Sequence, residues 1–114
     1  DINDYKDEII FGEKLISQVF KNKNKLKSFL DGRIPNWDTK RIAKIDLAII
    51  ISAIAELIYF PLIPVKVSIN EYIEISKEYS SPKSSAFING VLDKIIRDLT
   101  EDGTILKSGR GLIT

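Results

Sequence analysis

The chain has 114 residues, of which 44% are apolar and 29% are charged, so it can fold as one domain around a core. It contains no histidine and no cysteine, which excludes disulfides, thiol nucleophiles, zinc–thiolate sites and a histidine general base. Its 17 basic and 16 acidic residues leave a net charge of +1, so no strong overall attraction to nucleic acid is expected. These absences remove the most common catalytic and metal-binding side chains, and we expect no enzyme, no cofactor and no metal site.

Four main helices are predicted, and the first covers residues 5–30. Asp31 and Gly32 should end it, because glycine adopts the left-handed turn after a helix at little cost. The apolar residues of this segment recur at helical spacing, and they are Phe11, Leu15, Ile16, Val19, Phe20, Leu26, Phe29 and Leu30.

The second predicted helix covers residues 38–59, with Asp38 as its N-cap. Within residues 47–57 the only polar side chains are Ser52 and Glu56, and a helix that is apolar on all sides should be surrounded by others. The same run invites a membrane-spanning interpretation, but Pro61 ends the helix and a central glutamate is costly in lipid. We predict a buried core helix.

The third predicted helix covers residues 69–79 and has a clear start signal. Ser68-Ile69-Asn70-Glu71 has the pattern of a capping box, in which the serine caps the first turn and the glutamate reaches back. Its predicted buried stripe consists of Ile69, Tyr72, Ile73 and Tyr79.

The fourth predicted helix covers residues 82–102, with Ser81 as its N-cap and a proline at its first position. The residues after it follow no hydrophobic period. The chain is therefore predicted to consist of a helical domain over residues 1–103 and a flexible tail over residues 104–114.

Five residues are candidates for contact with RNA. Lys40, Arg41 and Lys44 share one face of the predicted second helix, where they could meet phosphates. Lys83 and Phe87 lie one turn apart at the start of the fourth helix. The spacing first suggests that Phe87 is a core residue. A cation, free amides and an aromatic ring at that place also suit a phosphate and an unpaired base.

Two further features have two interpretations each. The lysines at alternate positions of residues 21–27 fan around a helix, so they fit a solvated surface as well as an RNA contact. Trp37, in the predicted loop before the second helix, is either a core residue or a platform for stacking on a base.

Two segments resemble the NusB family in wording as well as pattern. Residues 64–77 match P-x-K-V-x-I-N-E-x-[IV]-E-[IL]-[AS]-K, and residues 87–94 match F-[IV]-N-G-[VI]-L-D-K. Weaker likeness extends the resemblance over roughly residues 9–99. The closing GRGL resembles the end of the longer NusB proteins of Bacteroidetes-like bacteria. The resemblance implies an all-α, NusB-like helical bundle.

The resemblance also implies a function in transcription antitermination and ribosomal RNA synthesis. Family members pair with a small-subunit ribosomal protein, NusE, and bind the boxA RNA element within the transcription elongation complex. The resemblance assigns Asp46 to the protein partner and places Phe87 near the RNA. The family's Arg-rich first helix is missing and the net charge is close to zero, so we expect this chain alone to bind RNA weakly. Lys83 stands where an acidic residue is often found in the family, which either favours RNA binding or changes its register.

Two alternatives stay open. NusB-like domains also precede the catalytic domain of some ribosomal RNA cytosine methyltransferases, although the closing GRGL argues against a domain that follows. The other alternative is a helical module that binds protein and no RNA. We expect a bacterial protein that is cytoplasmic and not bound to a membrane, and the lack of cysteine agrees with that location.

Overall fold

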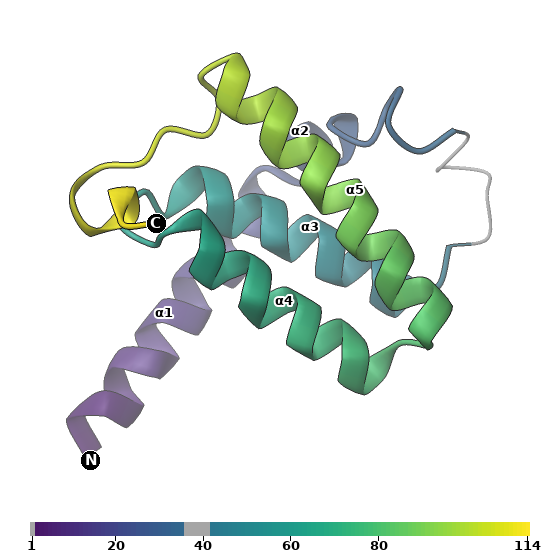
Figure 1. Ribbon diagram of the computed structural model, residues 1–114. Helices are drawn as coiled ribbons and strands as arrows, with labels where there is room; N and C mark the ends of the chain where they lie inside the picture. The colour runs from purple at the N-terminus through teal and green to yellow at the C-terminus, as the bar shows by residue number, and fades with distance from the viewer. Residues whose placement is uncertain (1, 36–41) are drawn as a thin grey trace.

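The computed structural model describes residues 2–35 and 42–114, and the regular secondary structure within these ranges is all helical. This confirms the predicted all-α fold (Figure 1). The helices are α1 (Ile2–Lys21), α2 (Lys23–Ser28), α3 (Lys44–Tyr59), α4 (Val65–Tyr79) and α5 (Pro82–Glu101), followed by the short 3-10 helix η1 (Gly109–Leu112).

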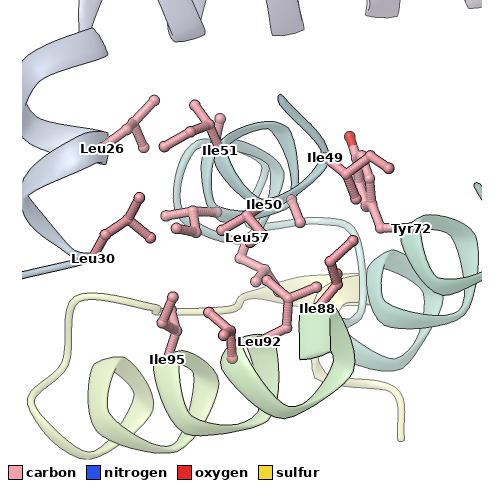
Figure 2. Close-up of a cluster of buried hydrophobic side chains, with 14 of the residues drawn as sticks. Leu26, Leu30, Ile49, Ile50, Ile51, Leu57, Tyr72, Ile88, Leu92 and Ile95 are labelled. Carbon is pink, nitrogen blue, oxygen red and sulfur yellow. The ribbon is translucent and has the colours of Figure 1, made fainter. Parts of the chain in front are cut away.

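Helix α3 is the central helix, as its composition predicts. It contacts each of the other four α-helices, and Ile50, Ile54 and Leu57 are completely shielded from solvent. Burying a side chain of this size contributes about 1.5–3 kcal/mol, which makes α3 the main source of hydrophobic stability. Figure 2 shows the side chains that surround it, among them Leu26 and Leu30 before it and Ile88, Leu92 and Ile95 of α5. No helix in the described part of the chain has the length and apolarity needed to cross a membrane.

The first predicted helix is two helices. Asn22 separates α1 from α2 and has a backbone outside the helical region, with φ −115° and ψ 21°. Its side-chain amide donates to the carbonyl oxygen and to the Oε1 of Gln18, both at 3.0 Å. An asparagine that bonds the preceding turn in this way competes with helical hydrogen bonding, so the chain changes direction here.

The second predicted helix begins later than residue 38. Ile42 and Ala43 are not helical, and Ala43 occupies the N-cap position with φ −56° and ψ 138°. Lys44 therefore opens α3, and the helix does not extend back through Ala43 and Ile42. Four residues of the sequence predictions, Trp37, Asp38, Lys40 and Arg41, lie outside the described residues.

The predicted capping box is wrong. Pro64 occupies the N-cap position of α4 with φ −59° and ψ 144°, so the helix begins one turn earlier than predicted. Proline fixes φ near the helical value and needs no amide partner at a helix start, which favours initiation here. Ser68 consequently lies inside the first turn, where its amide donates to the carbonyl oxygen of Pro64 at 3.2 Å and only 1% of its surface is exposed.

The predicted N-cap of α5 is confirmed. The hydroxyl oxygen of Ser81 accepts a hydrogen bond from the amide of Ser84 at 3.1 Å, and Pro82 takes the first helical position. We expect Ser81→Ala to lower the free energy of unfolding by about 1 kcal/mol, because one amide of the first turn loses its acceptor. Urea unfolding measures this, with Ser84→Ala as a control that keeps the amide. Equal losses in the two variants would show that the cap contributes nothing specific.

The segment after α5 follows a defined course over the loop that joins α3 to α4. Gly103 ends α5 with φ +84°, and the buried Ile105 donates its amide to the carbonyl oxygen of Leu99 at 2.9 Å. Lys107 Nζ and the amide of Ser108 then donate to the carbonyl oxygens of residues 60 and 61, each at 3.1 Å. The division of the chain into a domain and a flexible tail at residue 103 stays a prediction.

Candidate functional site

Two helix N-termini meet at one end of the molecule. Figure 1 shows the start of α3 beside the turn that joins α4 to α5. One hydrogen bond fixes this arrangement, because Asp46 Oδ1 accepts from the hydroxyl of Ser80 at 2.5 Å. Asp46 is in the first turn of α3, and Ser80 is the C-cap of α4 and directly precedes the N-cap of α5. We call this region, with Lys44, Lys83 and Phe87, the α3–α5 end.

Asp46 belongs to the interior of the α3–α5 end and not to its open surface. Only 5% of its surface is exposed, and its hydrogen bond to Ser80 is made within the chain. A carboxylate in the first turn of a helix also interacts favourably with the free amides there. Asp46 therefore has a structural role in holding α3 against the α4–α5 turn, beside the protein-partner role that the family resemblance predicts.

Lys44 and Lys83 are exposed at the α3–α5 end, each in the first turn of its helix. Neither forms an ion pair with any residue in the described ranges. A positive side chain at a helix N-terminus is electrostatically unfavourable, because the free amides there already carry partial positive charge. An anion placed between the amides and the lysine reverses this balance, so both positions suit a phosphate group.

Phe87 lies one turn after Lys83 and is half-buried. Part of its ring packs against the hydrophobic core, and the rest reaches the surface beside that lysine. The two interpretations of Phe87 from the sequence are therefore compatible. A ring that is anchored by the core is held in one orientation, and its exposed part is placed where it can meet an unpaired base.

A shallow groove between α4 and α5 continues from the α3–α5 end. Its floor is fixed by a buried hydrogen bond of 2.8 Å between the hydroxyls of Ser76 and Ser85. Its walls are formed by Ile73, Lys77, Pro82, Ser85, Ala86 and Asn89. Lys77 also forms an ion pair of 3.5 Å with Glu74. Both side chains are exposed, so this pair is too weak to hold the lysine in one position.

The structure thus brings together four of the six residues predicted for binding. Asp46, Lys44, Lys83 and Phe87 share one end of the molecule, and the other two, Lys40 and Arg41, are outside the described residues. The sequence did not identify Ser80, which lies 34 residues from Asp46 and gives no local signal of their contact.

Comparison with known proteins identifies one family. The NusB family matches residues 5–97. The chain is 42% identical over 103 residues to a protein of Salinibacter ruber, covering 90% of this chain and 64% of that protein. It is 43% identical over 100 residues to one of Chloroherpeton thalassium, covering 88% and 47%. It is 37% identical over 89 residues to one of Natranaerobius thermophilus, covering 78% and 64%.

All three relatives carry the name transcription antitermination protein NusB, which is not the name of an enzyme. The chain spans between about half and two thirds of the length of these relatives. The comparison with solved structures found no match.

Proposed function

Because the chain belongs to the NusB family, we propose that it acts in transcription antitermination by binding boxA-like single-stranded RNA together with a NusE-type small-subunit ribosomal protein. Membership of this family also agrees with the expectation that the protein is not an enzyme. The RNA element and the ribosomal partner come from the resemblance stated above and are part of the proposal.

The α3–α5 end is the surface proposed to bind RNA. It presents two exposed lysines at two helix N-termini, next to a half-buried aromatic ring. Backbone phosphates need cations and amide donors, whereas unpaired bases need a flat apolar surface, and both occur here within a short distance. Lys40 and Arg41 immediately precede this region in the sequence and are proposed as additional phosphate contacts.

The near-zero net charge limits how tightly the chain can bind RNA without a partner. With few phosphate contacts, the affinity should be weak and should fall only moderately with salt. A ribosomal protein bound beside the RNA would add contacts to the same ligand. We therefore propose that the complex of the two proteins, and not this chain alone, is the form that binds RNA with useful affinity.

Charge reversal at the α3–α5 end tests this function. We expect Lys44→Glu and Lys83→Glu each to weaken binding of labelled single-stranded boxA RNA, and each lost phosphate contact to flatten the salt dependence by about 0.7 log units. Phe87→Leu keeps the core filled but removes the stacking surface, so it should weaken binding by about 1–3 kcal/mol without changing the salt dependence. Fluorescence titrations at two salt concentrations, with and without the ribosomal protein, measure these changes.

Lys14→Glu is the matched control, because it makes the same charge change on α1, outside the α3–α5 end. An equal loss in this variant would mean that only overall charge matters and would contradict the proposed site. If the protein binds the ribosomal partner but no RNA under any condition, the alternative of a module that binds only protein is correct.

A further inference from the structure

Helix α5 presents a row of residues that begins at the α3–α5 end and continues along the helix, which leads away from the α4–α5 turn along one side of the molecule (Figure 1). Successive positions in this row are separated alternately by four and three residues, so they follow one another on a single helical face. We call this row the α5 stripe, and it consists of Lys83, Phe87, Gly90, Lys94 and Arg97. Phe87 is half-buried and the other four residues are exposed. The α5 stripe extends the α3–α5 end by about 21 Å, and Glu101, one turn later, ends it.

The positive charges of the α5 stripe are not neutralised by residues 2–35 or 42–114. Lys83, Lys94 and Arg97 form no ion pair with any residue in these ranges. Asp98 lies four residues after Lys94, a spacing at which the two side chains of a helix can pair. Its Oδ2 instead accepts a hydrogen bond of 2.9 Å from Nε of Arg33. Arg33 therefore neutralises this aspartate and leaves Lys94 available for an anion.

Gly90 lies at the centre of the α5 stripe, and no contact within the described chain requires a glycine there. A β-carbon at this position would have no neighbour within 4 Å, and the backbone of Gly90 does not have a positive φ. Glycine inside a helix is less favourable than alanine, so neither packing nor helix formation accounts for it. The space over Gly90 is open to a group from outside the chain, which can approach the helix backbone more closely than a side chain would allow.

Charge and composition favour RNA over a protein surface as the occupant of the α5 stripe. None of the large, exposed apolar side chains in the described part of the chain belongs to α5. Protein interfaces have an apolar centre, whereas an RNA backbone is bound by spaced cations. We propose that an RNA strand bound at the α3–α5 end continues along α5, where Lys94 and Arg97 contact its phosphates and its backbone passes over Gly90. This inference rests on the proposed function, because one RNA strand occupies both surfaces.

Removing the two distal charges of the α5 stripe tests the phosphate contacts, with labelled single-stranded boxA RNA and the ribosomal protein present. Lys94→Gln and Arg97→Gln should each flatten the salt dependence of RNA binding by about 0.7 log units, because each removes one phosphate contact. Lys66→Gln is the matched control, since it removes the charge of an exposed lysine on α4 and should leave the salt dependence unchanged. When the RNA is shortened from either end, one of the two series should lose the effects of Lys94→Gln and Arg97→Gln before it loses that of Lys83→Glu.

Gly90→Ala should change stability and RNA binding in opposite directions. Alanine favours the helix, so the urea concentration at the midpoint of unfolding should rise. The added methyl group occupies the space assigned to the RNA backbone, so the affinity for RNA should fall severalfold. Asn89→Ala is the control, because this exposed residue of α5 lies outside the α5 stripe and its replacement should stabilise the helix without weakening RNA binding.

Three results would overturn this inference, and they differ in what they mean for the proposed function. If Lys44→Glu and Lys83→Glu weaken RNA binding but the variants at residues 90, 94 and 97 do not, the RNA leaves α5 after its first turn and the proposed function stands. If those three variants instead weaken binding of the ribosomal protein in the absence of RNA, the α5 stripe is a protein surface. If the complex of the two proteins binds no boxA RNA, the proposed function and this inference fail together.

Discussion

Replacing Asp46 with lysine should lower the free energy of unfolding by about 3 kcal/mol, because the new ammonium group would be desolvated without an acceptor of opposite charge. The same change removes the acceptor of the Ser80 hydroxyl, which fixes the start of α3 against the α4–α5 turn. Only 5% of the aspartate surface is exposed, so solvent cannot compensate for either loss. Urea unfolding followed by circular dichroism measures the effect.

Asp46→Asn separates the structural role of this residue from the predicted partner contact. The amide oxygen can still accept from Ser80, so stability should fall by less than half of the loss caused by lysine. If Asp46 also contacts the ribosomal protein through its charge, the asparagine variant should fold normally and bind that protein more weakly. Unchanged binding would mean that the buried hydrogen bond is the only role of Asp46.

Replacing Glu56 with glutamine should raise the free energy of unfolding at neutral pH by about 1–3 kcal/mol. Glu56 is 1% exposed, and neither of its carboxylate oxygens has a hydrogen-bond partner among the described residues. Burial raises the pKa of Glu56 above its usual value of 4.5, and the nearby Ser68 hydroxyl and the charge of Lys107 offset only part of this rise. A neutral amide of the same shape avoids the cost of desolvating the charge.

The difference in unfolding free energy between the protein and Glu56→Gln should change with pH in one direction. A carboxyl group with a raised pKa in the folded state contributes stability that is complete below pH 4.5 and is lost as the pH rises through the raised value. The protein should therefore lose stability relative to Glu56→Gln as the pH increases above 4.5, and the two should converge in acid. The exposed Glu71 contributes to the same rise in pKa, so Glu71→Gln is a control with a smaller effect in the same direction. A stability difference between the protein and Glu56→Gln that grows as the pH falls would contradict this account.

Local signals in the sequence predicted those features of the fold that are determined by residues within or next to a single helix. The apolar run of α3 predicted its burial, and Ser81 and Gly103 predicted where α5 begins and ends. The start of α4 was not predictable in the same way, because Pro64 and Ser68 are competing start signals four residues apart. Packing decided between them by burying the serine next to Glu56.

The candidate site was predictable only in pieces. The spacing of Lys83 and Phe87 places both near the start of one helix, and that much is readable from the sequence. Their position near Lys44 depends on how α3 packs against the α4–α5 turn, through the hydrogen bond between Asp46 and Ser80. Contacts between residues far apart in the chain have no signature in a single sequence.

The route of the C-terminal segment places a strict demand on one position. The backbone at Gly111 passes so close to the α3–α4 loop that a β-carbon there would overlap the carbonyl oxygen of Pro61. Any relative with a larger residue at this position must send its last residues along another path. The presence of this glycine can therefore sort related sequences into those that share this C-terminal route and those that do not, before any of their structures is known.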